Sequence, residues 1–346
     1  MITDLAKKND STGRAERLSI EVTARCNRSC LQCFIRRGES QRPSLPIDLV
    51  NEIVAEGYHT NYRHLHITGG EPLLWEHLFE GIDYAFEIGY QTVFLNTNGS
   101  MLTNDICGRL GIYEGLSLSV SLDGPEVLHD HFRGAGSYSQ TIRGIENALN
   151  AGIDLFIFTT VCKSLLPDLP HFANNLFKQF KGINHLVLIQ LIRIKDAILD
   201  QAKELLNPDD FIQLVQIVSF LNLYGLKSYL LNDPLAGIVS KMLQMPWIQP
   251  VRPLYSDGSI FVMANFKMSL SHTSHEFDCQ YSPGMIEKVL ASDEYHRAVA
   301  PNKEICPSCK YNELCIDSGM VRPSESYMDM HPEVPYCKRV LNRIST

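Results

Sequence analysis

Three cysteines lie within eight positions near the start of the chain, in the segment "ARCNRSCLQCF", and they are Cys26, Cys30 and Cys33. Three thiolates on one loop can hold three irons of a cubane [4Fe–4S] cluster, which leaves the fourth iron free for an external ligand. A structural zinc site would normally close with a fourth protein ligand, and the sequence places none beside this loop. Three incidental core cysteines are a poor alternative because the residues around them are polar. The spacing therefore predicts an open metal cluster.

The segments around this loop alternate between short apolar runs and helical stretches, a pattern typical of parallel β-α-β units. The expected strands are 18–23, 64–68, 92–97, 116–122, 154–161 and 185–192. The expected helices are 47–58, 78–90, 138–152, 169–180 and a long one from the capping signal at 207–210 to Gly225. Right-handed crossovers coil such units into an open or closed barrel. We therefore expect an α/β fold.

Unusual loops follow four consecutive expected strands. The first strand ends at the Cys26 loop, and the next three end at "GGEP" (69–72), "NTNG" (96–99) and "SLDGP" (121–125). In barrels of this kind the active site gathers at the C-terminal ends of the strands. All four loops are therefore expected on one rim of the barrel.

Together these motifs resemble the radical S-adenosylmethionine (SAM) enzymes, whose three-cysteine loop follows the first strand of a partial (β/α)6 TIM-like barrel. The resemblance implies a [4Fe–4S] cluster held by Cys26, Cys30 and Cys33, with the amino and carboxylate groups of SAM on the open iron. It also implies that an electron from the cluster cleaves SAM, which gives a 5′-deoxyadenosyl radical that abstracts a substrate hydrogen. A donor such as flavodoxin or ferredoxin would supply that electron.

The resemblance extends to SAM-binding residues on the other rim loops. Gly69 and Gly70 allow close backbone approach to the SAM amino group, and the Glu71 carboxylate suits an ammonium. The remaining contacts that the resemblance implies on these loops are Asn96, Thr97, Asn98, Ser121, Asp123 and Arg133. The position before the third cysteine is often aromatic in this family and contacts adenine. Here it is Gln32, and Phe34, just beyond the third cysteine, is an expected SAM contact.

A second group of cysteines lies in the last fifth of the chain: Cys306, Cys309, Cys315 and Cys337. Four thiolates can close a site completely, so this set predicts a structural or electron-relay centre, with zinc as the alternative. The stretch resembles the SPASM/Twitch domains, which implies one auxiliary [4Fe–4S] cluster in a small, loop-rich domain. The match is partial, because Gly319 occupies the position of a further family cysteine.

The other cysteines carry weaker signals. Cys107 and Cys162 are predicted core residues, since free cysteine behaves as a small apolar side chain. Asp278 or Cys279, in the segment "SHTSHEFDCQYSP", is a predicted catalytic donor of a proton or hydrogen to the substrate side. Packing alone is the alternative for Cys279. A metal site with the two nearby histidines would lack a fourth ligand.

The expected domain order is an N-terminal arm (1–16), the radical SAM barrel (17–225), a linker region (226–253) and the auxiliary iron–sulfur domain (254–346). The Pro-rich segment "PWIQPVRP" predicts the boundary before the last domain. Directly after it, the Asp-Gly pair in "SDGS" predicts a hairpin.

Composition limits the classes of partner. The net charge of −8 argues against a general nucleic-acid or anionic-membrane surface, and no run of 18 apolar residues occurs. The N-terminal residues lack the apolar core of a signal peptide. Ten cysteines without a secretion signal indicate metal ligation in a reducing compartment, so we expect a cytoplasmic protein with neither nucleic-acid nor membrane partners.

The substrate stays open between two classes. A SPASM-like tail favours a maturase that forms a cross-link, a thioether or an oxidised side chain on a ribosomally made peptide or protein. The residues before position 17 are expected to be too few for a leader-peptide recognition domain, so a separate leader-peptide-binding protein is the expected partner. A single auxiliary site favours small-molecule chemistry, such as tetrapyrrole or haem (haem d1-like) tailoring or cofactor synthesis. A non-enzymatic iron–sulfur carrier or sensor is the remote third class, because a carrier gains nothing from an open iron.

Overall fold

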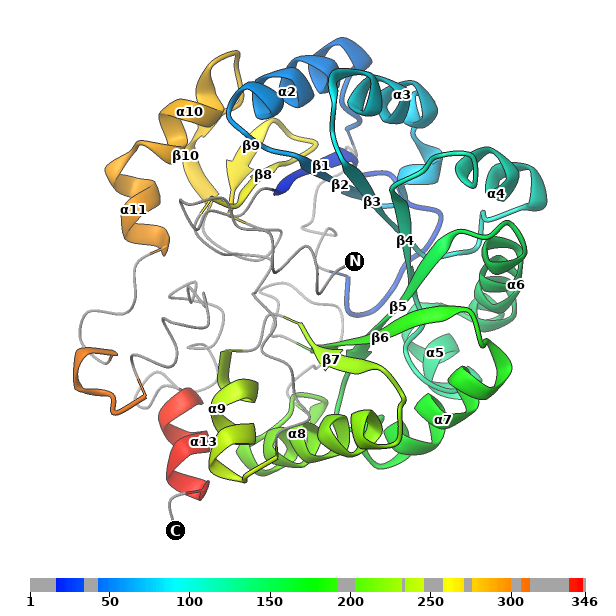
Figure 1. The fold of residues 1–346 in the computed structure, drawn as a ribbon, viewed down its shortest axis with the longest axis vertical. Coiled ribbons are helices and arrows are strands. Elements are labelled where there is room, and N and C mark those ends of the chain that lie inside the picture. The colour runs from blue at the N-terminus through cyan, green and yellow to red at the C-terminus, as the bar shows by residue number, and fades with distance from the viewer. Residues whose placement is uncertain are drawn as a thin grey trace.

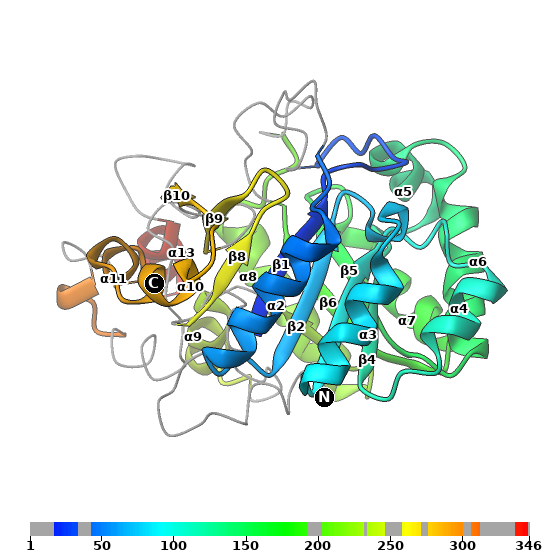
Figure 2. The same ribbon diagram turned by 90° about the horizontal axis from the view of Figure 1, so that it is seen from above.

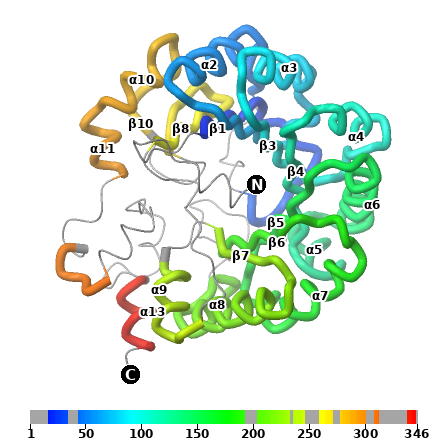
Figure 3. The backbone as a smooth tube through the Cα atoms, in the orientation of Figure 1, coloured from blue at the N-terminus to red at the C-terminus, as the bar shows by residue number. Residues whose placement is uncertain are grey.

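The computed structural model describes residues 17–33, 43–191, 203–231, 234–245, 258–270, 276–299, 306–311 and 336–344. Its centre is one curved ten-stranded sheet in the order β10-β9-β8-β1-β2-β3-β4-β5-β6-β7. Figure 1 shows the strands inside a ring of helices, and the tube in Figure 3 follows the same circular path from β1 around to β7. The arrangement is an incomplete barrel of the TIM type, so the predicted fold class is confirmed.

Seven neighbouring strands of the sheet run parallel to one another, from β1 to β7. Their bounds are β1 Arg17–Thr23, β2 His64–Gly69, β3 Thr92–Thr97, β4 Leu116–Ser121, β5 Asp154–Val161, β6 Ile183–Gln190 and β7 Ser228–Leu230. Each predicted strand overlaps an observed one, and the largest shift is two residues at the start and end of β6. The alternation of apolar and polar residues was therefore a reliable signal for these strands.

Helices and short 3-10 turns connect the strands and cover the outside of the barrel, as the side view in Figure 2 shows for α2, α3 and α4. They are α2 Ile47–His59, η1 Pro72–Leu74, α3 Leu78–Ile88, α4 Asn104–Leu110, α5 Glu126–Arg133, α6 Ser137–Asn150, η2 Leu166–Asp168, α7 Leu169–Gln179 and α8 Pro208–Leu223. The predicted capping signal before α8 is confirmed, because Asn207 and Asp210 form a reciprocal capping box.

The core lies between the strands and this helical layer. On β1, Leu18, Ile20 and Val22 are fully buried and point toward the helices, whereas Ser19 and Glu21 point to the inside of the barrel. Cys107 and Cys162 are also buried, at 0% and 2% exposure, which confirms their predicted place in the core. None of the helices in the described residues combines the length and apolar character that a membrane span requires.

The part of the chain that follows β7 adds three more strands to the described sheet. The remaining elements are α9 Pro234–Met242, β8 Ile260–Val262, β9 Lys267–Ser269, β10 Glu276–Gln280, α10 Met285–Leu290, α11 Asp293–Val299, η4 Cys306–Ser308 and α13 Tyr336–Ile344. The β8 strand pairs with β1 in parallel, and β9 and β10 then add antiparallel strands. The segment predicted as a linker, 226–253, instead contributes β7 and α9. The C-terminal segment therefore extends the barrel sheet.

The predicted hairpin is displaced along the chain. The described hairpin joins β8 to β9 through residues 263–266, where the Phe266 N–H donates to the Met263 carbonyl and Phe266 has a φ of 69°. Gly258, from the predicted turn, precedes β8 instead and has a φ of 91°. An Asp-Gly pair marks a tight turn in either setting, so the sequence signal alone did not place the strands.

Candidate active site at the rim of the barrel

The cysteine loop follows β1 directly and is fixed by hydrogen bonds to the end of α5 and to the loop after β3. The Leu31 N–H donates to the Phe132 carbonyl at the end of α5 (2.8 Å). Asn27 donates to the Ser100 hydroxyl (3.0 Å) and accepts from the Asn98 amide (2.9 Å), both in the loop after β3. The loop thus has a defined backbone position before any ligand is considered.

The "GGEP" loop after β2 is hydrogen-bonded to the backbone at the start of the cysteine loop. The Gly70 N–H donates to the Thr23 carbonyl (2.7 Å), and the Glu71 N–H donates to the Arg25 carbonyl (2.8 Å). A Cβ atom on Gly70 would lie 2.3 Å from the Arg25 carbonyl oxygen, and one on Gly69 would lie 2.4 Å from the Thr23 oxygen. Both glycines are therefore required by the approach of two protein segments. Their contact with the SAM amino group stays a prediction.

The Glu71 carboxylate lies completely inside the protein, at 0% exposure. It accepts hydrogen bonds from the Thr97 hydroxyl (2.8 Å), the Asn98 N–H (2.8 Å) and the Leu73 N–H (3.2 Å). Burial raises the pKa of Glu71, and these hydrogen bonds act in the opposite direction. The carboxylate therefore joins the loops after β2 and β3, and its contact with the SAM ammonium group stays a prediction.

A second buried carboxylate joins β4 to the cysteine loop. Asp123 is 2% exposed; its Oδ2 accepts from the Gln32 amide (2.7 Å) and from the Arg133 guanidinium (2.5 Å), and its Oδ1 accepts from the Thr160 N–H (2.7 Å). The Asp123 N–H in turn donates to His129 Nδ1 (3.1 Å). This network of paired charges and amides holds the third-cysteine end of the loop against the barrel.

The three thiols are partly buried and electrostatically coupled. Burial raises the pKa of Cys26 to about 11, and the negative charges of Glu71, Cys30 and Cys33 add to the rise. Burial also raises the pKa of Cys30, whereas the nearby Arg133 cation lowers it. The thiols of Cys26 and Cys30 are therefore protonated at neutral pH, and binding of a metal cluster must release their protons.

This donor set fits a cubane cluster better than a single ion. Within the described residues, no group of three or more His, Cys, Asp or Glu side chains could hold one metal ion. Ligands of one zinc ion converge on a single centre, whereas cubane thiolates each bind a different iron. Cys26, Cys30 and Cys33, on a fixed loop with the Arg133 cation beside two of them, are the residues that would hold the [4Fe–4S] cluster.

The predicted SAM-binding residues divide into two groups. Thr97 and Asn98 bind Glu71 and the cysteine loop, as described above, and Asp123 and Arg133 bind each other. Asn96 and Ser121 differ, because both lie on the inner faces of their strands and stay partly exposed there. Asn96 lies on the inner side, where its side chain accepts a hydrogen bond from Ser119. Asn96 and Ser121 are the members of the set that line the inside of the barrel.

Sequence reasoning missed four residues of this rim. Gln32 stood out only as a departure from an aromatic pattern, yet it is the amide that fixes the loop to Asp123. Asn27 and His129 carry no motif of their own, and Arg28 contacts Gln140 of α6. The polar character of the cysteine loop was the available signal, since buried polar groups require partners.

The second group of predicted site residues lies on β10, three strands away from β1 in the order of the sheet. Cys279 and Phe277 are on the face of β10 that packs against the core, and Asp278 is exposed on the other face. Burial raises the pKa of Cys279, and the Glu294 and Asp278 carboxylates add to the rise. This placement favours packing for Cys279, and the catalytic role of either residue stays a prediction.

The tail cysteines are described in part. Cys309 follows η4 and Cys337 lies in α13, and both are partly buried. The backbone of Cys306 starts η4, whereas Cys315 lies outside the described residues, as does Phe34 near the rim. The predicted four-cysteine site therefore stays a prediction.

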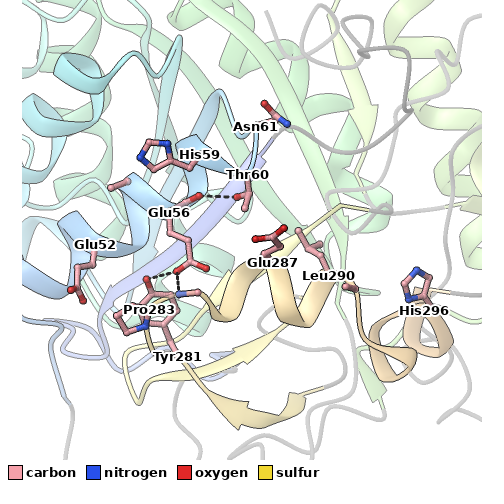
Figure 4. A pocket seen from close by; sticks show the side chains of 13 residues that line it. Glu52, Glu56, His59, Thr60, Asn61, Tyr281, Pro283, Glu287, Leu290 and His296 are labelled. Carbon is pink, nitrogen blue, oxygen red and sulfur yellow. Dashed lines mark hydrogen bonds between the residues drawn. The ribbon is translucent and has the colours of Figure 1, made fainter.

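A cavity of about 830 Å³ opens on the outside of the barrel, between α2 and the segment that leads into α10. Figure 4 shows Glu56 pointing across this junction toward Tyr281. The Glu56 carboxylate accepts from the Tyr281 hydroxyl (2.7 Å), the Gly284 N–H (3.0 Å) and the Ile286 N–H (2.7 Å). None of the described residues that line the cavity is a cysteine, so it is separate from the rim site.

Comparison with known families agrees with the geometry of the rim. A model of the radical SAM superfamily matches residues 20–169, which include the cysteine loop and all the rim loops described above. Mycofactocin maturase MftC of Mycolicibacterium smegmatis is 30% identical over 158 residues, which are 45% of this chain and 40% of that protein. The AdoMet-dependent heme synthase of Oleidesulfovibrio alaskensis is 32% identical over 164 residues, 46% of this chain and 41% of that protein. The chain thus matches less than half the length of these relatives.

Solved structures resemble the chain over nearly its whole length. The structure of anSMEcpe with bound AdoMet and Kp18Cys peptide has a TM-score of 0.70 at 18% identity and covers 95% of this chain and 96% of its own. Streptococcus suis SuiB bound to precursor peptide SuiA has a TM-score of 0.71 at 13% identity and covers 94% of this chain and 74% of its own. At these identities the likeness shows a shared fold.

Proposed function

We propose that this chain, which matches the radical SAM superfamily model over residues 20–169, reductively cleaves SAM to a 5′-deoxyadenosyl radical that abstracts a substrate hydrogen. The cluster supplies the electron and SAM supplies the radical, while the protein orients and shields them. The observation that carries the proposal is the three-cysteine loop at the C-terminal ends of parallel strands, with no described fourth ligand and a backbone fixed by its neighbours.

The rim residues have three different roles in binding the cofactors. Cys26, Cys30 and Cys33 hold the cluster, and the Arg133 cation beside Cys30 and Cys33 offsets part of its negative charge. Asn96 and Ser121 line the inner side, where SAM and substrate bind. Glu71 and Asp123 act through the loops that they fix, which makes them positioning residues.

The test is anaerobic reconstitution with iron and sulfide, followed by dithionite and SAM. Wild-type protein is expected to release 5′-deoxyadenosine, and Cys30→Ala is expected to lose at least about 1,000-fold of that rate, because the cluster loses one ligand and its electron path to SAM. Cys107→Ala, a matched thiol removal in the core, on α4, is expected to keep the rate of SAM cleavage. Wild-type protein that binds iron and yields no 5′-deoxyadenosine would instead be a non-enzymatic iron–sulfur carrier or sensor.

For the substrate we propose a side chain of a ribosomally made peptide or protein. The support is that the MftC relative is named a maturase and that the anSMEcpe and SuiB structures, which share the fold, are described with bound peptides. A separate leader-peptide-binding protein and a flavodoxin or ferredoxin donor would be the partners. With a deuterated candidate peptide, deuterium is expected to appear in 5′-deoxyadenosine.

Haem-related small-molecule chemistry is the second candidate. The heme synthase of Oleidesulfovibrio alaskensis is as similar to this chain as the maturase is, and that of Methanosarcina barkeri is 36% identical over 155 residues. The same deuterium experiment with a labelled iron porphyrin distinguishes the two classes, because only the true substrate transfers its label to 5′-deoxyadenosine.

The tail is proposed to hold one auxiliary [4Fe–4S] cluster on Cys306, Cys309, Cys315 and Cys337. The support is the four-thiol set together with the two described members in partly buried positions. Cys315→Ala is expected to lower bound iron from about eight to about four atoms per chain. Unchanged iron with zinc present in stoichiometric amount would identify the tail as a zinc site.

A further inference from the structure

The end of helix α5 lies against the cysteine loop, next to two of the three cysteines. The Leu31 N–H, one residue after Cys30, donates to the Phe132 carbonyl (2.8 Å). Arg133 follows Phe132 and is the last residue of α5. The backbone of Arg133 is therefore beside the part of the loop that runs from Cys30 to Cys33.

The Arg133 side chain is fixed at this place through the Asp123 carboxylate. Arg133 Nε donates to Asp123 Oδ2 (2.5 Å), and the Gln32 amide donates to the same oxygen (2.7 Å). Gln32 directly precedes Cys33, so one shared acceptor joins the guanidinium to the third-cysteine end of the loop. The Thr160 N–H binds the other carboxylate oxygen (2.7 Å). These hydrogen bonds hold Asp123 in one orientation, and Asp123 holds the cation.

The guanidinium keeps its positive charge in this position, although it is largely enclosed. The Arg133 side chain is 14% exposed, and the Asp123 side chain is 2% exposed. Burial acts to lower the pKa of Arg133, but the negative charges of Asp123 and Cys30 raise it above its ordinary value. Since little water surrounds the pair, its effect on neighbouring charges is only weakly screened.

The Arg133 charge outweighs the Asp123 charge at the cysteine loop. Burial raises the pKa of Cys30, whereas the Arg133 charge lowers it, and this lowering is larger than the opposite effect of Asp123. The two charges of the pair therefore do not cancel at this sulfur. Any group that binds there experiences a net positive field from the pair.

A positive field matters at this loop because reduction changes the charge of a bound cluster. One-electron reduction by the proposed flavodoxin or ferredoxin donor adds one negative charge to the cluster, and the donor is oxidised by one electron. Net charge and hydrogen bonds to the sulfurs are among the factors that set the reduction potential of iron–sulfur clusters. A fixed cation stabilises the more negative, reduced form more than the oxidised form, so it raises the potential.

We propose that Arg133, which Asp123 and Gln32 hold in place, raises the reduction potential of the cluster on the cysteine loop. The inference rests on the proposed function only in taking the cluster to be bound there. Arg133 acts through its charge at the cluster, so this role needs no contact with SAM. A potential measured without SAM therefore separates this role from the predicted contact of Arg133 with SAM.

Reductive titration with dithionite, followed by electron paramagnetic resonance in the absence of SAM, measures the potential. A Cys315→Ala background removes the proposed tail cluster, so that one cluster contributes the signal. Arg133→Gln is expected to leave about tenfold less reduced cluster at a fixed potential, which corresponds to a fall of about 59 mV for one electron. Arg133→Lys keeps the charge and is expected to stay within about threefold of the background chain.

Two further variants keep the test valid and specific. Arg133→Gln alone leaves the buried Asp123 carboxylate without its cation, which can prevent folding. Arg133→Gln combined with Asp123→Asn removes both charges and is still expected to lower the potential, because the Arg133 charge is the stronger one at the loop. Arg109→Gln removes a guanidinium at the end of α4, 3.5 Å from the centre of the Phe79 ring, and is expected to keep the potential.

An unchanged or higher potential in the single and double variants would overturn the inference, and so would an equal fall in the Arg109 variant. The result is distinct from that of the proposed function. A chain whose potential falls as expected but which releases no 5′-deoxyadenosine keeps this role of Arg133 and loses the proposed reaction. A chain that releases 5′-deoxyadenosine and has the same potential in every variant loses only the role of Arg133.

Discussion

Two glutamates of this chain, Glu71 and Glu56, each join segments that are distant in sequence, and they do so in different surroundings. Glu71 accepts three hydrogen bonds at the rim and is 0% exposed. Glu56 also accepts three, from the segment around α10, but it lies at the edge of an open cavity and is partly exposed. If the Glu56 carboxylate is removed, water can hydrogen-bond to the donors that it leaves behind. Water cannot reach the donors that bind Glu71, because they are buried.

The difference indicates that the rim, which carries the candidate site, tolerates less structural change than the α2–α10 junction. The rim is fixed by fully buried polar networks, which tolerate little movement of the cysteine loop. At the α2–α10 junction three hydrogen bonds converge on one partly exposed carboxylate, so we expect their loss to cost less there than at the rim. Substitutions in the two regions are therefore expected to differ in their effect on stability.

The largest effect is expected for Glu71→Ala. It leaves the Asn98 N–H and the Thr97 hydroxyl buried without an acceptor, which costs about 3 kcal/mol in the free energy of unfolding. Urea unfolding measures this cost. Glu76→Ala, at a side chain that is 86% exposed, is the control and is expected to change stability by less than about 0.5 kcal/mol. Equal effects of the two substitutions would mean that the rim carboxylate is not structural.

A pH effect of intermediate size is expected at His129, beneath Asp123. Burial, followed by the Arg133 charge, lowers the pKa of His129 to about 4, whereas the unfolded chain protonates near 6.5. Below pH 6.5 the unfolded state therefore binds an extra proton. The stability that the neutral ring contributes is lost as the pH falls toward 4, by at most about 1.4 kcal/mol per pH unit.

Urea unfolding at pH 7 and pH 5 measures this loss. His129→Gln is expected to flatten the pH dependence, and His171→Gln, at an exposed histidine of α7, is expected to leave it unchanged. If the His129 variant keeps the wild-type slope, the acid sensitivity belongs to other buried histidines.

The smallest effect is expected for Glu56→Ala. Loss of its three hydrogen bonds costs about 1 kcal/mol, because the junction is open to water. Hydrogen exchange should accelerate at the Gly284 and Ile286 amides and stay unchanged at the Asn98 amide. Glu52→Ala, one turn earlier on α2, is the control. Faster exchange at Asn98 would show that the two junctions are coupled.

The parallel strands from β1 to β6 could be predicted because the sequence patterns that indicate them are local. Strand periodicity and the capping box at Asn207 depend on residues that are neighbours in sequence. The hairpin after Gly258 and the strand β7 within the predicted linker could not be placed from the sequence. The strands β7 and β8 are three residues long and are stabilised by pairing with β6 and β1.

The sequence by itself determined the order of the strands and the presence of cysteines and glycine-rich turns at their C-terminal ends, because these are properties of short segments. Only the tertiary structure decided which rim residues face inward. Asn96 and Ser121 line the interior, while Glu71 and Asp123 turn inside the protein to satisfy buried amides. The physical reason is that a polar side chain binds whichever partner folding brings within reach, and the sequence does not record that distance.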